Sequence, residues 1–183
     1  MIRKMTGALA LAAIIACFVT ACNSVPVTDQ EKSLFGDEVG SAIQRFHNID
    51  PFIGRQMDSA WGYAVFPSVG RGGVGLGGAY GAGEVFEKGQ PVGYCELKQG
   101  TIGAQLGGQE YRELILFQDA GALSRFKNNE FAFAAQANAV AAKEGTSTDA
   151  DYKEGVIVYT EPIGGLMAEA SVGGQKFSFR PLK

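Results

Sequence analysis

The chain has 183 residues with a formal net charge of −3, 26 glycines, one histidine and three cysteines. This length suits one domain with a substantial core, and the mildly acidic balance argues against a general nucleic-acid binder. A usual zinc site needs several Cys or His ligands, so we expect no metal and no cofactor.

The chain begins with a predicted secretory leader over residues 1–21. Arg3 and Lys4 precede an uncharged apolar run over residues 7–19, and small residues follow where cleavage is expected. This order is typical of a signal peptide, with a retained membrane helix as the alternative. Because Arg3 and Lys4 are the only charged residues of the leader, its removal lowers the net charge from −3 to −5.

Residues 19–22, Val-Thr-Ala-Cys, resemble the lipobox of bacterial lipoproteins. In that family Cys22 would carry acyl chains such as palmitate and become the first residue of the mature protein. Asn23 stands where such lipoproteins carry an Asp that retains them in the inner membrane. The resemblance therefore implies a lipid-anchored protein on the outer membrane of a Gram-negative type bacterium, facing the periplasm. Residues 22–27 would be the tether and residues 28–183 the folded domain.

An amphipathic helix is predicted over residues 29–47. Thr28 and Glu31 form a capping box in front of it, in which each residue satisfies a backbone N–H of the other. A second, short helix is expected after Asp50, which would cap it, with Pro51 at its first position. The first helix has apolar side chains that recur at helical spacing, namely Leu34, Phe35, Val39, Ala42, Ile43 and Phe46.

Most of the chain from Trp61 onward is predicted to form short strands joined by glycine-rich or polar turns. A short helix fits residues 119–128, and residues 131–142 favour a strand over a helix because apolar side chains alternate there. Many short strands with few helices indicate an α+β fold. We expect a curved antiparallel β-sheet, as a sandwich or an open barrel, with two or three packed helices. The other predicted strands cover residues 61–67, 83–87, 92–98, 101–117, 156–161, 165–174 and 176–180.

Eight glycines lie within residues 70–83, and Gly73, Gly75 and Gly78 match the spacing G-x-G-x-x-G of dinucleotide-binding loops. That motif requires a helix directly after the glycines, and the sequence predicts a strand and a turn instead. A strand with glycine on one face and Val74, Leu76 and Tyr80 on the other fits better. The glycines are therefore predicted to serve sheet curvature and close packing, with a groove for a lipid tail or a partner as a lesser alternative.

Residues 61–86 resemble the SYLF domain, a lipid-binding module of bacterial and eukaryotic proteins. Its apolar strand ending in Phe-Pro corresponds to Phe66 and Pro67, and its Gly-x-Tyr-Gly-x-Gly core corresponds to residues 78–83. The resemblance extends over roughly residues 33–176 and implies binding of membrane lipids without catalysis. Phosphoinositides are the ligands of eukaryotic members, but a periplasmic protein meets none, so the natural lipid stays open.

Two groups of side chains are candidates for lipid contact. The first is the apolar face of the first helix, with docking of that face on the sheet as the favoured alternative. The second is a set of cations beside glycine-rich strands, with scattered surface charge as the favoured alternative. A net charge of −5 argues against purely electrostatic binding to anionic lipid. The candidate residues are Leu34, Phe35, Val39, Phe46, Arg71, Lys98 and Arg112.

No catalytic residues are predicted, because the single histidine, His47, has no neighbouring partner for a nucleophilic triad. Cys95 is expected to be a small buried apolar residue, and Asp149, Asp151 and Glu154 are expected to form a plain acidic loop rather than a calcium site.

The sequence thus predicts a non-catalytic envelope lipoprotein that binds membrane lipids, among them anionic phospholipids. The alternative is a structural or protein-binding envelope factor whose only lipid contact is its anchor, and an enzyme of unrecognised type is a weaker third.

Overall fold

The computed structural model describes residues 25–130, 132–133, 139–141 and 151–182. The predicted leader, Cys22, most of the predicted strand over residues 131–142 and Asp149 lie outside these residues. The described part contains the helices α2 (Asp29–Ile49), α3 (Pro51–Ser59) and α4 (Ala120–Lys127), and the strands β1 (Gly62–Glu87), β2 (Gln90–Phe117), β3 (Ala132–Phe133), β4 (Ala139–Ala141) and β5 (Val156–Pro181).

The strands form one sheet in the order β1-β2-β5-β3, and these neighbours pair antiparallel, while β4 pairs parallel with β5. The predicted fold class, α+β with a curved antiparallel sheet, is confirmed. The prediction of many short strands is wrong in detail, because β1, β2 and β5 run for 26, 28 and 26 residues. The glycines that indicated breaks instead let each strand bend while its pairing to the next strand continues.

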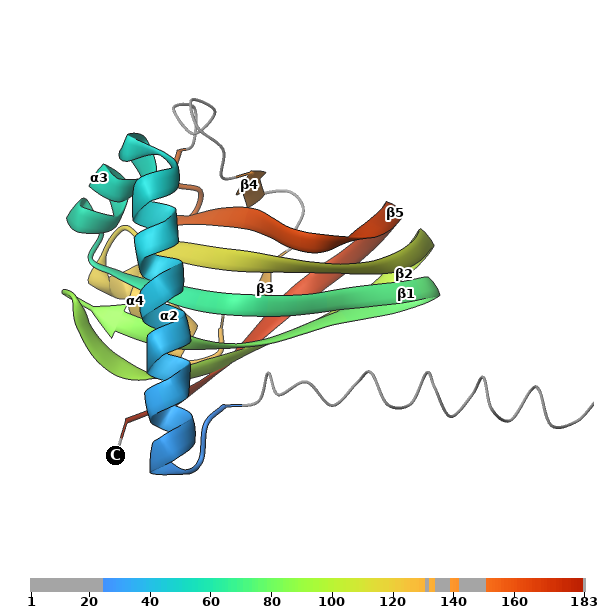
Figure 1. The fold of residues 1–183 in the computed structure, drawn as a ribbon. Coiled ribbons are helices and arrows are strands. Elements are labelled where there is room, and N and C mark those ends of the chain that lie inside the picture. Colours follow the sequence, from blue (N-terminus) through green and yellow to red (C-terminus); the bar gives the residue numbers. More distant parts are fainter. Residues whose placement is uncertain (1–24, 131, 134–138, 142–150, 183) are drawn as a thin grey trace, which may run out of the picture.

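The long strands bend near their midpoints, so that the sheet folds back on itself as two facing layers. Figure 1 shows β1 running from the helices to the far end of the molecule and then returning. At the bend of β1, Gly75 has a φ of 71°, a conformation that glycine adopts without steric cost. Phe66 and Phe177, from the two layers, contact each other with ring centroids 6.0 Å apart.

The predicted role of the glycines in close packing is confirmed on β1. A Cβ atom added at Gly83 would lie 2.7 Å from the ring of Phe66 and 2.7 Å from the carbonyl oxygen of Val65. A Cβ atom at Gly81 would lie 2.8 Å from the side chain of Val69. The two halves of β1 therefore approach each other at distances that only glycine permits.

Two apolar cores stabilise this arrangement. One lies between the two layers and is closed at the helical end by α4, whose Phe126 packs on Phe117 and Phe177. The other lies on the outer face of the sheet beneath α2 and α3. The helix α2 contributes Val39, Ala42 and Phe46 to it, all buried.

The predicted helix starts are confirmed. Thr28 and Glu31 form both bonds of the capping box, and the carboxylate of Asp50 accepts from the backbone N–H of Phe52 at the start of α3. These bonds satisfy backbone donors that a helix leaves unpaired at its first turn. A third cap follows the same rule at α4, where Asp119 accepts from Ala122.

Candidate functional site

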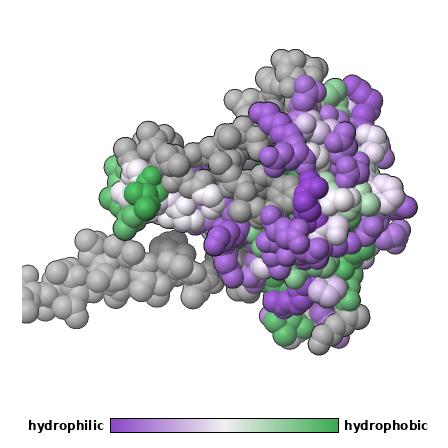
Figure 2. Space-filling model, turned by 180° about the vertical axis from the view of Figure 1, so that it is seen from behind, coloured by the Kyte–Doolittle hydropathy of each residue, from purple (hydrophilic) through white to green (hydrophobic). Residues whose placement is uncertain are grey.

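The bend of the sheet carries an exposed apolar tip, which we define as Val74, Leu76, Ile102 and Leu106. Their exposed fractions are 74%, 69%, 71% and 65%. Val74 lies opposite Leu106 and Leu76 opposite Ile102 in the pairing of β1 with β2. Figure 2, which views the molecule from behind, shows apolar residues gathered at the outer end of a projection.

The sequence around the tip explains why these side chains point outward. Strand residues alternate between the two faces of a sheet, and at the bend of β1 glycines occupy the inner face, where a Cβ at Gly73 would collide with the backbone of Leu76 and Gly77. No charged residue stands between Arg71 and Glu84, or between Lys98 and Glu110. The segments of β1 and β2 that form the tip therefore carry no charge, and the nearest charged residue in the pairing is Glu169 of β5, opposite Gln105.

The apolar face predicted on the first helix is mostly occupied by the fold. Val39 and Phe46 are fully buried against the sheet. Phe35 is half-buried and contacts Tyr94 edge-on, with ring centroids 6.0 Å apart. Leu34 alone among the four helix candidates is exposed, at 58%. Docking on the sheet is therefore the arrangement of α2, and it removes Val39 and Phe46 from the residues that can contact lipid.

The three predicted cations do not come together. Lys98 is exposed and pairs with Glu96 at 2.9 Å. Arg112 lies on the outer face of the sheet and pairs with the buried Glu161. Arg45 of α2 contacts the same carboxylate at 2.6 Å, so this group joins the helix to the sheet. Arg71 has a different position, because it extends between the two layers.

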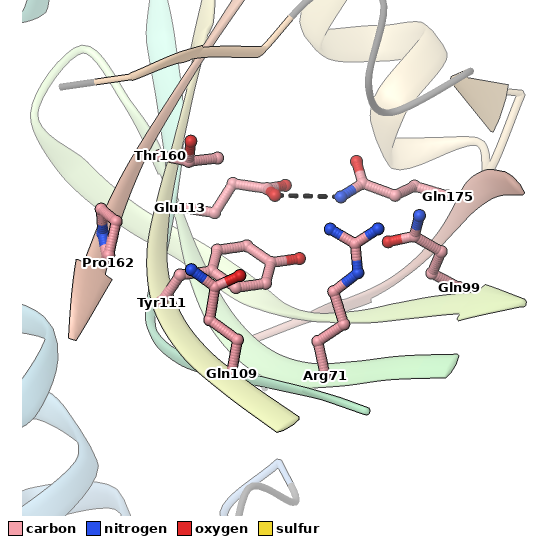
Figure 3. A pocket seen from close by; sticks show the side chains of 8 residues that line it. All are labelled: Arg71, Gln99, Gln109, Tyr111, Glu113, Thr160, Pro162 and Gln175. Atoms are coloured by element: carbon pink, nitrogen blue, oxygen red, sulfur yellow. Dashed lines mark hydrogen bonds between the residues drawn. The ribbon is translucent and has the colours of Figure 1, made fainter. Parts of the chain in front are cut away.

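Arg71 extends into a polar pocket between the layers, with a volume of about 100 Å³. Figure 3 shows its guanidinium beside the side chains of Gln99, Gln175 and Glu113. Gln109, Tyr111, Thr160 and Pro162 complete the lining, so the pocket takes residues from β1, β2 and β5.

The pocket contains more hydrogen-bonding capacity than the protein uses. The amide nitrogen of Gln175 donates to Glu113 Oε2 at 3.0 Å. Within the described residues, both amide atoms of Gln99, Oε1 of Glu113 and Oε1 of Gln175 have no hydrogen-bond partner, although all three side chains are buried. A buried polar atom left unpaired costs about 1–3 kcal/mol. An arrangement of this kind is typical of a site that a ligand or ordered water completes.

Burial also changes the acidity of this region. It raises the pKa of Glu113 to about 7, although the bond from Gln175 and the nearby charge of Arg71 act in the opposite direction. The same cause raises the pKa of the Cys95 thiol, with the charge of Glu113 adding to it. Cys95 is fully buried, as predicted, and a thiol held protonated is a poor nucleophile.

Sequence reasoning did not identify the tip or the pocket as sites. The sequence signal for the tip was present, because Val74 and Leu76 alternate with glycine, and Ile102 and Leu106 are each followed by glycine. For the pocket no local signal exists, because Gln99, Glu113 and Gln175 meet only through the pairing of β2 with β5 and the fold of the sheet.

The described residues show neither of two further features, a membrane-spanning helix and a cluster of metal ligands. No helix there combines the length and apolar character that crossing a bilayer requires. No group of three or more His, Cys, Asp or Glu side chains gathers there as a metal site would need.

Comparison with known proteins gives one informative similarity. No family model matches the chain. The chain is 30% identical over 138 residues to Beta cell expansion factor A of Aeromonas veronii. The match covers 75% of this chain and 52% of the relative, so the chain spans about half the length of the curated relative it matches.

Proposed function

We propose that this protein is a non-catalytic, membrane-binding envelope lipoprotein with a SYLF-like domain. Acylated Cys22 would hold it to the outer membrane, facing the periplasm, and the folded domain would contact lipid through the apolar tip. The leader and lipobox of the sequence support the anchor, and the resemblance of residues 61–86 to SYLF domains supports the lipid-binding domain.

The observation that carries the lipid contact is the tip itself. Fully burying a large aliphatic side chain contributes about 1.5–3 kcal/mol, and the tip presents Val74, Leu76, Ile102 and Leu106 together. Hydrocarbon does not tolerate unpaired backbone groups. The strand β2 meets this requirement on its β5 side, where the pairing continues without interruption through the tip, and on its β1 side except at residues 103–105, opposite the bulge at Gly75.

The shape of the tip favours lipid over a protein partner. Figure 1 shows the bend of β1, which carries Val74 and Leu76, at the end of the sheet away from α2, α3 and α4, and Figure 2 shows apolar residues at the outer end of a projection. A stable protein interface buries about 1,200–2,000 Å² in total, whereas insertion into a bilayer requires only a few apolar side chains. A narrow apolar end therefore suits a bilayer surface.

A vesicle experiment tests this proposal on residues 23–183, which carry every described element but no acyl chain. Co-sedimentation with phosphatidylcholine vesicles, with and without phosphatidylglycerol, is measured at low and moderate salt. We expect binding that salt weakens little, because apolar contacts are not screened. The double variant Leu76→Ser/Ile102→Ser should bind at least tenfold more weakly, because two apolar side chains no longer enter the membrane.

The matched control is Leu34→Ser, which removes an exposed apolar side chain from α2 and should leave vesicle binding unchanged. Equal binding by the parent and the tip variant would reject the tip as the contact. Loss of binding in Leu34→Ser alone would assign the contact to the helix. No binding by the parent to any vesicle would leave Cys22 as the only lipid contact and favour a protein-binding envelope factor.

A further inference from the structure

The polar pocket between the layers has more empty volume than a purely structural contact between polar side chains needs. It also has more polar atoms without a hydrogen-bond partner. Its volume of about 100 Å³ is about three times the share of liquid volume that one water molecule occupies. Gln99 is 7% exposed and Gln175 is 3% exposed, and both amide atoms of Gln99 and the amide oxygen of Gln175 are unpaired. We propose that this pocket binds a phosphate group together with a hydroxyl, which is carried on the phosphorus in inorganic phosphate or on an attached glycerol in glycerol phosphate.

The distribution of donors and acceptors supports this ligand. Arg71 supplies a positive charge and a planar array of N–H donors, which suits an oxyanion. The amide nitrogen of Gln99 adds a donor. The carbonyl oxygens of Gln99 and Gln175 are acceptors that an oxyanion without hydrogen cannot satisfy, and a hydroxyl on the ligand would donate to them.

Glu113 is compatible with an anion in the same pocket. Its Oε2 accepts from Gln175 at 3.0 Å, so a proton held by this carboxyl lies on Oε1, the unpaired oxygen. Burial raises the pKa of Glu113 to about 7, which makes the protonated form available near neutral pH. In that form Glu113 donates to the ligand, and Arg71 supplies the only charge among the described residues that line the pocket.

The directions of these groups favour phosphate over carboxylate. Arg71 approaches from β1, Gln99 and Glu113 from the two halves of β2, and Gln175 from β5. Groups that converge from several strands and both layers match the tetrahedral oxygens of phosphate better than the two coplanar oxygens of a carboxylate.

The position of the pocket allows two sources of the same chemistry. Arg71 precedes Val74 of the tip by three residues, which is about 10 Å along a strand. The headgroup layer of a bilayer is about 5–8 Å deep on each side. A membrane entered by the tip would therefore bring its phosphate groups near Arg71, and in phosphatidylglycerol the headgroup glycerol supplies the hydroxyl that a phosphodiester lacks. This lipid source rests on the proposed function, whereas binding of a free phosphate does not.

Isothermal titration calorimetry on the full chain, in neutral detergent and phosphate-free buffer near pH 7, tests the proposal. The ligands are inorganic phosphate, glycerol 3-phosphate and sulfate, which has no hydroxyl at this pH. We expect saturable binding of both phosphates and at least tenfold weaker binding of sulfate. Arg71→Gln and Gln99→Leu should each weaken phosphate binding at least tenfold.

The matched control is Arg55→Gln, which removes an exposed arginine from α3 and should bind phosphate as the parent does. Gln99→Leu keeps the test valid if Arg71→Gln fails to fold, because it replaces a buried amide without partners by an apolar side chain of similar size. Absence of saturable phosphate binding would overturn the proposal. Equal phosphate binding by the parent, Arg71→Gln and Gln99→Leu would also overturn the proposal, because it would show that the pocket holds water and not the phosphate.

Vesicles added as competitors identify the source of the phosphate. Displacement of bound phosphate by vesicles with phosphatidylglycerol, but not by phosphatidylcholine alone, assigns the pocket to a lipid headgroup. Phosphate binding that neither vesicle displaces assigns the pocket to a free phosphate compound, and both results support the proposal. The variant Leu76→Ser/Ile102→Ser should keep its affinity for free phosphate, so failure of the membrane contact and failure of the pocket are distinguishable.

Discussion

At the scale of single residues, Glu113 is a carboxyl that the fold places in an unusual environment. It is buried between the layers, with one oxygen bonded to Gln175 and the other unpaired. Its pKa rises from 4.5 to about 7 because burial disfavours the charged form. The folded state therefore binds the proton of Glu113 more tightly than the unfolded state does.

This difference predicts how stability changes with pH. Below about pH 4.5 the carboxyl is protonated in both states, so it imposes no penalty. Between about pH 4.5 and 7 the unfolded state loses the proton first, and stability falls with rising pH to a loss of about 3 kcal/mol above pH 7. Glu113→Gln should remove this loss and be more stable than the parent at pH 8 but not at pH 4.5.

Urea unfolding of the parent and of Glu113→Gln at several pH values between 4.5 and 8 measures the effect. Carboxyls with lowered pKa values, such as Glu87 and Glu96, contribute the opposite slope mainly below about pH 4.5, and they do so equally in both proteins. The difference between the two curves therefore isolates Glu113. A constant difference across this pH range would contradict the raised pKa.

At the scale of the elements, the doubled strand β1 depends on where its glycines stand. Gly83 faces Phe66 and Val65 at distances that leave no room for a Cβ atom. Gly100 of β2 has no heavy atom within 4 Å of the position of an added Cβ atom. The two glycines belong to the same sheet, but only the position of Gly83 is too crowded for a side chain.

Alanine at these two positions should therefore have different effects on stability. Gly83→Ala should lower the free energy of unfolding by about 1–3 kcal/mol, because the methyl group must push the two halves of β1 apart. Gly100→Ala should change it by less than about 0.5 kcal/mol or raise it slightly, because alanine restricts the unfolded chain. Chemical denaturation of the two variants and the parent measures this. Similar values for both would show that the close approach in β1 relaxes without cost.

At the scale of the whole molecule, three zones follow one another along the folded sheet. The apolar core with α4 lies at one end, the polar pocket comes next, and the apolar tip forms the far end. The proposed anchor at Cys22 precedes α2, so the protein would have two separate means of contacting lipid. One is covalent and the other depends on the fold.

These two contacts should be separable in cells. Cys22→Ser should abolish incorporation of labelled palmitate, because the sulfur that carries the acyl chain is absent, and should leave the tip as the only membrane contact. Leu76→Ser/Ile102→Ser should keep both the label and the membrane fraction. Unchanged labelling of Cys22→Ser would show that the protein is not a lipoprotein of the proposed kind.

The amino-acid sequence by itself determined the features that depend on near neighbours. The capping box of Thr28 and Glu31, the cap at Asp50 and the start of α4 were all predictable, because each involves residues within one helical turn. The glycine face of β1 was also predictable from alternation, and so was the fold class. The placement of Cys22, by contrast, remains a prediction from the lipobox alone.

The tertiary structure alone decided which surfaces are available for function. An amphipathic helix can face a sheet or a membrane, and only its docking showed that Val39 and Phe46 are core while Leu34 is exposed. The pairing of β1 with β2 placed Val74 beside Leu106 at one tip. The pairing of β2 with β5 and the fold of the sheet then brought Glu113 to Gln175, 62 residues away in the chain. Contacts across such separations depend on strand register and on bending at glycines, which local sequence preference does not specify.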